Sequence, residues 1–244
     1  RGHNIGADGL LVLLESSVAD CRMLVVNSDG SVPEMCGNGF RCFVAYITHQ
    51  GFFEKKSLTI ETDAGVLDAS IISDDGALMQ VSVNTGRALY GDALPLNDFQ
   101  LADPSQLDIE LNVKDQLFVA TPVSMGNPHC VIVVPSVDAV DVLGIGPNIE
   151  THPFFPNRVN VEFVELVSSS HYKMRVWERG VGETNACGTG ACAAVVAGLL
   201  AHNGVEVVTV SLRGGELLIS VDPQSYYVHM QGPAQFVFSS RISI

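Results

Sequence analysis

The sequence has few positive charges. Lys and Arg together make up 13 of its 244 residues, against 27 Asp and Glu, so the formal net charge is −14. A protein that binds nucleic acid needs clustered basic side chains to neutralise phosphates, and the basic residues here form no cluster. We therefore expect no nucleic-acid partner, and we take the acidic surface only as a sign of solubility.

Long hydrophobic runs are absent as well. Hydrophobic residues make up 47% of the chain, which excludes disorder. No run approaches the roughly 20 residues needed to cross a bilayer, so we expect no membrane partner. A chain of 244 residues is long enough to bury a sizeable core in one or two domains.

The six cysteines include no Cys-x-x-Cys pair, which gives a structural zinc site little support, and we expect no metal. No secretory leader is visible in the printed residues, and two cysteines occupy places where a free thiol would be useful. We therefore expect a reducing, cytoplasmic compartment rather than disulfides. The other four are expected to be small, buried core residues: Cys21, Cys42, Cys130 and Cys192.

Short apolar runs bounded by Gly, Asp and Ser dominate the chain, and they predict strands. The first set of predicted strands comprises residues 10–14, 23–26, 58–62, 66–72 and 78–83. The second set comprises residues 117–121, 130–134, 161–166, 172–177, 207–212, 217–221 and 226–230. The segment 86–112 between the two sets contains prolines at 95 and 104 and predicts an irregular linker.

Two segments break this strand pattern. Residues 40–50 and 191–203 are apolar nearly all round, and each is followed by a glycine, Gly51 or Gly204. A glycine just past the end is typical of a helix C-terminus, and all-round hydrophobicity predicts a buried helix. Each half of the chain is therefore expected to be a curved sheet wrapped around one central helix.

The motif Cys-Gly-x-Gly occurs twice, at residues 36–39 and 187–190, and each copy opens one of the predicted helices. The spacing upstream also matches, because Asn27 lies nine residues before Cys36 and Glu178 lies nine residues before Cys187. If the four-residue motif recurred only by chance, the spacing upstream of its two copies would not be expected to match. We therefore expect an internal repeat of one α/β unit.

The repeat also predicts a loop in front of the first motif. The loop at residues 124–129 precedes the second motif, and Gly126 lies 61 residues ahead of Cys187. The same distance ahead of Cys36 falls before residue 1. We therefore expect the first half to have an equivalent loop, with its neighbouring elements, that the printed residues do not contain.

The doubled cysteine suggests a definite reaction. A cysteine at a helix N-terminus feels unpaired N–H groups, and its pKa can fall from about 8.5 towards roughly 3.5–7.5. The same N–H groups can hold a carboxylate. If Cys36 and Cys187 flank one substrate carbon, a thiolate can remove its proton while a thiol on the other side returns one, which inverts the configuration. Two helix dipoles would stabilise the intermediate negative charge.

Several longer motifs resemble those of a known family. Residues 27–31 (Asn-Ser-Asp-Gly-Ser) and 35–42 (Met-Cys-Gly-Asn-Gly-Phe-Arg-Cys) are similar to the first signature of diaminopimelate epimerases. Residues 178–193, from Glu-Arg-Gly-Val-Gly-Glu-Thr to Ala-Cys-Ala, are similar to the second. Residues 126–129 and 158–160 resemble two further patches of the family. The resemblance covers essentially the whole chain.

The resemblance implies an α/β fold of two pseudo-symmetric domains, each a mixed, barrel-like sheet wrapped around a central buried helix, with the active site in the cleft between them. It places one epimerase half at residues 1–88, joined by a final strand at about 233–244, and the other at 89–232. It implies a cofactor-independent epimerase that interconverts LL- and meso-2,6-diaminopimelate by thiolate/thiol proton transfer, in lysine and peptidoglycan precursor biosynthesis.

The resemblance also assigns site residues. It implies that Cys36 and Cys187 are the two acid/base groups, and that His129 and Glu178 tune the pKa of the thiols. The residues implied to bind substrate are Asn27, Gly37, Asn38, Asn127, Asn160, Glu178, Arg179, Gly188 and Thr189. Simpler roles are open for some of them: Asn27 in a turn, His129 as an ordinary loop histidine, and Arg179 in a surface ion pair.

Chains of this family begin with a strand and a loop resembling His-Gly-x-Gly-Asn-Asp-Phe, whose Asn binds substrate. That loop is not among the printed residues. A molecule that truly lacked it is expected to show weak or no activity and an exposed sheet edge. The oligomeric state is open, a homodimer included.

Three alternatives are weighed against this assignment. A proline racemase-like enzyme is one, although a substrate with a single amine would not need Arg179 together with three asparagines. A non-catalytic amino-acid-binding protein is another, for which both cysteines would be needless. A pyridoxal-phosphate racemase is the third, and it would need a Schiff-base lysine among the four lysines of the chain.

Overall fold

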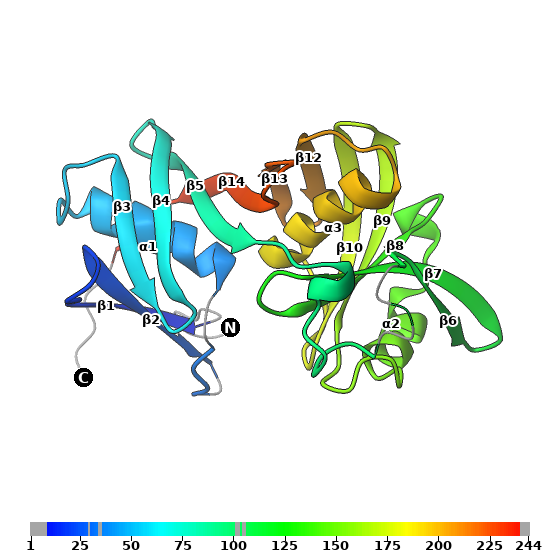
Figure 1. Cartoon of the computed structure of the whole chain (residues 1–244). Coiled ribbons are helices and arrows are strands. Elements are labelled where there is room, and N and C mark those ends of the chain that lie inside the picture. Colours follow the sequence, from blue (N-terminus) through cyan, green and yellow to red (C-terminus); the bar gives the residue numbers. More distant parts are fainter. Residues whose placement is uncertain (1–8, 29, 34–35, 101–102, 104–105, 240–244) are drawn as a thin grey trace. The chain divides into compact units, whose positions relative to one another are not determined.

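The computed structural model describes residues 9–239 apart from 29, 34–35, 101–102 and 104–105. The chain divides into two compact units (Figure 1). Unit 1 contains the chain up to Asn84 and again from Gln231, and unit 2 contains Thr85–Met230. The chain therefore passes from unit 1 to unit 2 within strand β5 (Leu78–Arg87) and returns within strand β14 (Tyr227–Gln235).

The return through β14 corrects one expectation. The sequence predicted a strand that ends at 230 and a separate one from about 233, whose last residues, 240–244, lie outside the described part of the chain. The structure instead has one strand from Tyr227 to Gln235, because Val228, Met230 and Ala234 continue a single alternation of buried and exposed positions. Pro233 lies within this strand rather than at a break.

Unit 1 is a sheet packed on one helix. Its strands are β1 (Gly9–Leu14), β2 (Cys21–Asn27), β3 (Ser57–Thr62), β4 (Gly65–Asp74) and β5. Their order in the sheet is β1-β2-β3-β4-β5, followed by β14. The β2–β3 pair is parallel, and the β1–β2, β3–β4 and β4–β5 pairs are antiparallel.

Helix α1 (Gly37–His49) lies across this sheet (Figure 1). Residues of α1 and of β2 to β5 form the unit 1 core. The helical residues in that core follow a spacing of three and four: Phe40, Phe43, Val44 and Ile47. The helix is not buried all round as expected, because Cys42 is exposed and Tyr46 is 49% exposed. Gly51 follows the helix with φ +72°, as the glycine signal predicted.

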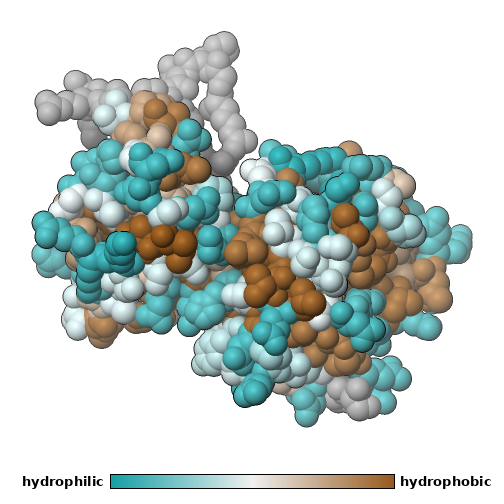
Figure 2. All heavy atoms as spheres, turned by 90° about the horizontal axis from the view of Figure 1, so that it is seen from above, coloured by the Kyte–Doolittle hydropathy of each residue, from teal (hydrophilic) through white to brown (hydrophobic). Residues whose placement is uncertain are grey.

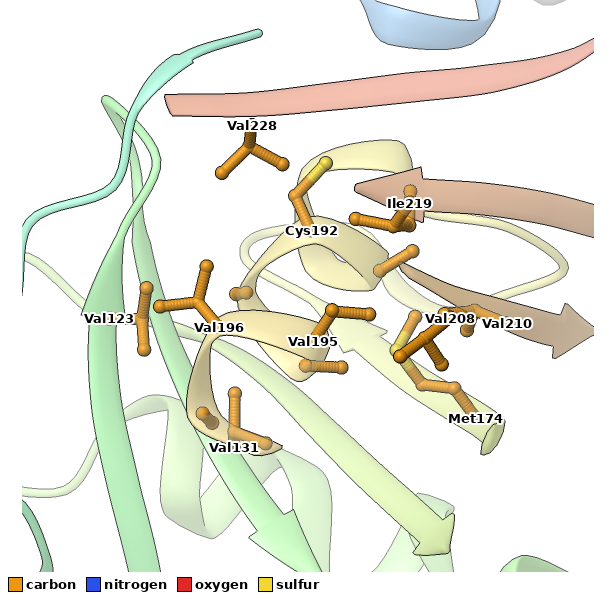
Figure 3. Close-up of a cluster of buried hydrophobic side chains, with 14 of the residues drawn as sticks. Val123, Val131, Met174, Cys192, Val195, Val196, Val208, Val210, Ile219 and Val228 are labelled. Atoms are coloured by element: carbon orange, nitrogen blue, oxygen red, sulfur yellow. The ribbon is translucent and has the colours of Figure 1, made fainter. Parts of the chain in front are cut away.

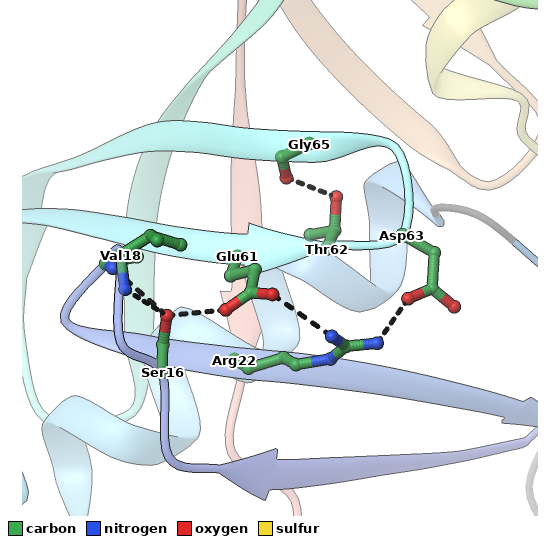
Figure 4. A network of polar contacts seen from close by, with 8 residues as sticks. Ser16, Val18, Arg22, Glu61, Thr62, Asp63 and Gly65 are labelled. Atoms are coloured by element: carbon green, nitrogen blue, oxygen red, sulfur yellow. Dashed lines mark hydrogen bonds and ion pairs between the residues drawn. The ribbon is translucent and has the colours of Figure 1, made fainter.

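A polar network ties β2 to β3 on the other side of unit 1 (Figure 4). The Arg22 guanidinium donates to Glu61 at 3.0 Å and to Asp63 at 2.6 Å. Glu61 also accepts a hydrogen bond from the Ser16 hydroxyl at 2.5 Å. Because Arg22 lies on the parallel partner of β3, these contacts hold the register of the one parallel pair described in this unit.

Unit 2 is a larger sheet with helices on both faces. Its strands are β6 (Ile109–Val113), β7 (Gln116–Ser124), β8 (Pro128–Val133), β9 (Asn160–Ser168), β10 (His171–Glu178), β11 (Gly182–Thr184), β12 (Val207–Leu212) and β13 (Gly215–Val221), next to which β14 begins. The order is β14-β13-β12-β10-β9-β8-β7-β6, and β11 pairs with β10. The β8–β9 and β10–β12 pairs are parallel.

Helix α3 (Gly188–Ala201) is the centre of unit 2. Its first three turns are almost wholly buried, as expected of a helix that is apolar all round. Figure 3 shows Val195 and Val196 of α3 among valines from the surrounding strands, with Val123 and Val131 on one side. The prediction of a sheet wrapped around a central helix is confirmed for this unit.

The opposite face of β8 and β9 carries a second core. Cys130 and Phe163 point away from α3 and pack with Val142 and Ile149 of helix α2 (Val142–Glu150). The sequence did not predict α2, because Gly144, Gly146 and Pro147 are typical of loops. The helix forms because Asp141 caps its first turn, where its carboxylate accepts from the Gly144 N–H at 3.0 Å.

The predicted linker at 86–112 is also more ordered than expected. It contains the end of β5, a single 3-10 turn at Gly91–Ala93, and most of β6. Leu94 and Phe99 from this segment are buried in the core beside α2. A second 3-10 turn, Val137–Ala139, precedes α2.

Figure 2 shows the hydrophobic residues of this face gathered in several patches among hydrophilic ones. The most exposed of the large ones are Leu96, Val181 and Val237, at 78%, 74% and 80%. None of the helices that the structure describes has both the length and the hydrophobicity needed to span a bilayer.

Candidate active site

Both Cys-Gly-x-Gly motifs begin a helix, with the cysteine at the N-cap. Cys36 precedes α1 and Cys187 precedes α3, and both have extended backbone angles, φ −136° and −127°. The Cys36 sulfur accepts from the Gly39 N–H at 3.4 Å. The Cys187 sulfur lies 3.6 Å from the Thr189 hydroxyl. Each thiol therefore lies beside the first-turn N–H groups of a helix, where negative charge is stabilised.

The glycines of these motifs leave room for the chain's own side chains. A Cβ at Gly190 would come within 2.7 Å of a Glu162 carboxylate oxygen, and one at Gly188 within 2.8 Å of the Met230 sulfur. In the first motif, a Cβ at Gly39 would lie 3.1 Å from Leu11 and 3.3 Å from the Cys36 sulfur. Close internal packing at the helix starts thus favours glycine, in addition to the ligand access expected from the sequence.

A buried polar chain lies beside Cys187. His129, on β8, contacts the Glu162 carboxylate with Nδ1 at 2.7 Å, and both side chains are fully buried. Its Nε2 lies 3.0 Å from the Asn127 side-chain oxygen. The Asn127 amide nitrogen in turn donates to the Thr189 hydroxyl at 3.4 Å. These contacts connect the strand pair β8–β9 to the first turn of α3.

The Cys187 thiol is held in its protonated form. Burial raises its pKa well above the ordinary value for a cysteine, and only 7% of the residue is exposed. The negative charges of Glu178 and then Glu162 raise the pKa further, while hydrogen bonds at the helix start act weakly in the opposite direction. From the sequence we expected the helix N-terminus to lower the pKa of this cysteine. In the structure the desolvation of the thiol outweighs that effect.

Glu178 lies next to this thiol at the end of β10. Burial raises the pKa of its carboxyl, and the charge of Glu162 adds to the shift. Hydrogen bonds from the Thr184 hydroxyl and the Cys187 thiol favour the charged form. A carboxyl with a raised pKa that accepts a bond from a thiol is suited to exchanging a proton with it.

Asn160 braces two backbone segments of the site. Its amide nitrogen donates to the Pro128 carbonyl at 3.0 Å, and its oxygen accepts from the Arg179 N–H at 2.9 Å. The residue is 5% exposed. Both ends of this side chain are thus engaged with backbone, which holds the loop at Asn127 and the turn at Arg179 in fixed positions.

Glu150, at the end of α2, supports the same turn. Its carboxylate accepts from the Gly180 N–H at 2.9 Å and from the Trp177 indole at 2.7 Å. The Arg158 guanidinium lies 3.6 Å away on the exposed side. Arg179 itself is exposed, and its guanidinium donates to the Asn157 carbonyl at 3.3 Å.

The predicted residues of unit 1 lie at the end of β2 and at the start of α1. The Asn27 side chain donates to the Ser31 hydroxyl at 3.0 Å in an exposed turn, which fits the simpler reading of this residue. The Asn38 oxygen accepts from the Arg41 guanidinium at 2.9 Å. Arg41 also donates to the Gly37 carbonyl at 3.3 Å and so braces the first turn.

The predicted site residues divide between the two units. In unit 1 they are Asn27, Cys36, Gly37 and Asn38. In unit 2 they are Asn127, His129, Asn160, Glu178, Arg179, Cys187, Gly188 and Thr189. Sequence reasoning missed Glu162 and Glu150. The signal for Glu162 was an acidic residue directly between the apolar Val161 and Phe163 in a buried part of the strand.

No group of three or more His, Cys, Asp or Glu side chains in the described part of the chain is arranged to hold a metal ion. The polar residues beside Cys187 are instead bonded to one another.

A family model described as diaminopimelate epimerase matches residues 1–90 and 121–237. The chain belongs to the diaminopimelate epimerase family. It is 45% identical over 239 residues to the diaminopimelate epimerase of Moorella thermoacetica (strain ATCC 39073 / JCM 9320), covering 98% of this chain and 85% of that protein. It is 46% identical over 239 residues to the diaminopimelate epimerase of Desulfitobacterium hafniense (strain DSM 10664 / DCB-2), covering 98% and 83%.

Solved structures show the same fold at low sequence identity. A phenazine biosynthesis protein of the PhzF family from Bacillus anthracis matches 95% of this chain and 82% of its own, with a TM-score of 0.64 and 20% identity. A probable proline racemase from Agrobacterium radiobacter K84 matches 97% and 76%, with a TM-score of 0.66 and 15% identity. These likenesses confirm the predicted fold class of this epimerase family member.

Proposed function

We propose that this chain interconverts LL- and meso-2,6-diaminopimelate without a cofactor, in the cytoplasmic synthesis of lysine and peptidoglycan precursors. The observation that carries the proposal is family membership over nearly the whole chain, together with a cysteine at the N-cap of each central helix. The reaction inverts one carbon that bears an ammonium, a carboxylate and a hydrogen. It needs one group to remove the proton and another to return it.

Cys187 supplies the proton in this proposal. Its buried thiol has a raised pKa and is hydrogen-bonded to Glu178, so it rests as the acid. Cys36, less buried at the start of α1, is then the base that takes the substrate proton in the same direction of reaction. In the reverse direction the two sulfurs exchange roles.

The helix starts bind the reacting carboxylate. The N–H groups of Gly37 and Asn38, and those of Gly188 and Thr189, lie in the first turns, where unpaired N–H groups and the helix dipole favour an anion. As the α-carbon loses its proton, charge moves onto this carboxylate, so the same donors stabilise the transition state more than the substrate.

The distal ammonium and carboxylate of the substrate need their own partners. Arg179 is an exposed cation in a turn that Asn160 and Glu150 hold in place, and it is suited to bind the distal carboxylate. Asn27 and Asn127 offer amide oxygens for the ammonium. The distal groups thereby select a substrate with two amino-acid centres over one with a single amine.

The test is turnover with defined stereoisomers. Purified protein, with no added cofactor and under reductant, is incubated with LL-diaminopimelate, and the appearance of the meso form is followed by chiral chromatography. L-Proline is the comparison substrate. We expect epimerisation of diaminopimelate and none of proline; racemisation of proline alone, or binding of diaminopimelate without turnover, would overturn the proposal.

A further inference from the structure

Glu162 is a buried acid that the proposed reaction does not use directly. It lies on the α3-facing side of β9, opposite Val131 of β8 and Val176 of β10, where the alternation would place an apolar residue. Its side chain is fully buried. An ionised carboxylate in such a place is costly unless it is paired, so a specific partner is required.

That partner is His129. Glu162 Oε1 lies 2.7 Å from Nδ1, and the other ring nitrogen, Nε2, lies 3.0 Å from the Asn127 oxygen. Both ring nitrogens therefore face oxygen acceptors, since the Asn127 amide nitrogen is used towards Thr189. A histidine can donate from both nitrogens only as the imidazolium.

We propose that Glu162 is a positioning residue that holds His129 as a doubly protonated imidazolium, so that His129 Nε2–H fixes the Asn127 side chain against the first turn of α3. This inference rests on the proposed function, because it gives Asn127 and the start of α3 their substrate-binding geometry. The buried pair of Glu162 and His129 is neutral as a whole, which limits the cost of placing both charges in the core.

Two further observations support the arrangement. Gly190 is required beside Glu162, because a Cβ there would lie 2.7 Å from Oε1 and would displace the carboxylate. The second Glu162 oxygen, Oε2, has no hydrogen-bond partner in the described part of the chain, so His129 is its main source of stabilisation.

The other titratable groups near this pair are identified by their contacts. Glu178 on β10 and Cys187 at the start of α3 both feel the charge of Glu162. Cys130, on the opposite face of β8, feels it as well. Cys130 and Cys187 have raised pKa values from burial and stay neutral near neutral pH, so Glu178 is the one competing charge in this set.

The experiment is nitrogen NMR of the histidine rings in the full chain without substrate. The chain has seven histidines, and His129→Gln assigns the signal. We expect both ring nitrogens of His129 to carry a proton near neutral pH, because each of them faces an oxygen acceptor. In Glu162→Gln one of the two nitrogens should lose its proton at the same pH.

Glu165→Gln is the matched control, because Glu165 lies on the same strand but contacts the Val137 N–H and Lys173 instead. It should leave the His129 signals unchanged. Glu162→Gln should also lower kcat/KM for diaminopimelate by roughly tenfold, whereas Glu165→Gln should not. An unprotonated ring nitrogen in the unaltered protein, or unchanged signals in Glu162→Gln, would overturn the inference whether or not the chain proves to be an epimerase.

Discussion

The side-chain oxygen of Asn160 accepts a hydrogen bond from the backbone N–H of Arg179 at 2.9 Å. The amide nitrogen of the same side chain donates to the Pro128 carbonyl at 3.0 Å. One asparagine thus joins the loop that carries Asn127 to the turn that carries Arg179. Its contribution to the site is to fix two backbone segments, and a substrate contact through the same amide would have to compete with these bonds.

Removal of the Asn160 side chain should therefore loosen both segments. We expect Asn160→Ala to lower the free energy of unfolding by about 2 kcal/mol, since two hydrogen bonds contribute about 1 kcal/mol each. KM for diaminopimelate should rise more than kcat falls. Urea unfolding and steady-state kinetics measure the two effects, with Asn148→Ala on the exposed face of α2 as the control. An unaltered KM in Asn160→Ala would contradict the bracing role.

Glu150 gives a second test of how the turn at Arg179 is held, and the fluorescence of Trp177 reports on it. Trp177 is the one tryptophan in the sequence, and its indole donates to Glu150 at 2.7 Å. In Glu150→Ala the indole loses this partner, and the Gly180 N–H loses its acceptor. We expect a shift in the tryptophan emission maximum and a loss of about 2 kcal/mol in stability. Glu110→Ala, at an exposed position on β6, should change neither quantity.

The raised pKa of Cys187 predicts a pH-dependent reactivity. The thiolate is the reactive form, and burial followed by the charge of Glu178 disfavours it, so alkylation of Cys187 by iodoacetamide should be slow at pH 7 and rise only at strongly alkaline pH. Removal of the neighbouring negative charge in Glu178→Gln should lower the pKa and speed alkylation at any given pH. Peptide mass spectrometry follows the reaction at each cysteine.

Glu216→Gln is the control for this measurement, because Glu216 is exposed and bonds to Ser211 away from the thiol. It should leave the Cys187 profile unchanged. A Cys187 that alkylates rapidly at pH 7 in the unaltered protein would show that the thiol does not rest in the protonated form.

Much of the architecture follows from local sequence pattern. Helix α3 was predictable because every face of it is apolar and a sheet must surround it. Helix α2 was not, because its two glycines and Pro147 indicate a loop, and only the Asp141 cap and the packing of Gly146 under Trp177 make a helix favourable there. The same limit applies to β14, whose continuity through Pro233 depends on neighbouring strands.

The sequence predicted which residues lie at the helix starts better than it predicted what each residue of the site does. The two Cys-Gly-x-Gly motifs indicated thiols at helix starts, and both cysteines lie there. The protonation of Cys187 was not predictable, because it depends on Glu162 and Glu178, which approach only in the folded sheet. The bracing use of Asn160 depends in the same way on contacts to residues 32 and 19 positions away along the chain.

In the proposed mechanism two sulfur atoms share one proton-transfer reaction, and solvent deuterium exchange at the substrate carbon reports on that transfer. Diaminopimelate is incubated in deuterium oxide with the unaltered chain, with Cys36→Ala, with Cys187→Ala and with Cys192→Ala, a core variant outside the site. We predict deuterium at the inverted carbon with the unaltered and Cys192→Ala proteins, and a loss of epimerisation by roughly a hundredfold or more in each of the other two. Near-native epimerisation by either Cys36→Ala or Cys187→Ala would contradict the account.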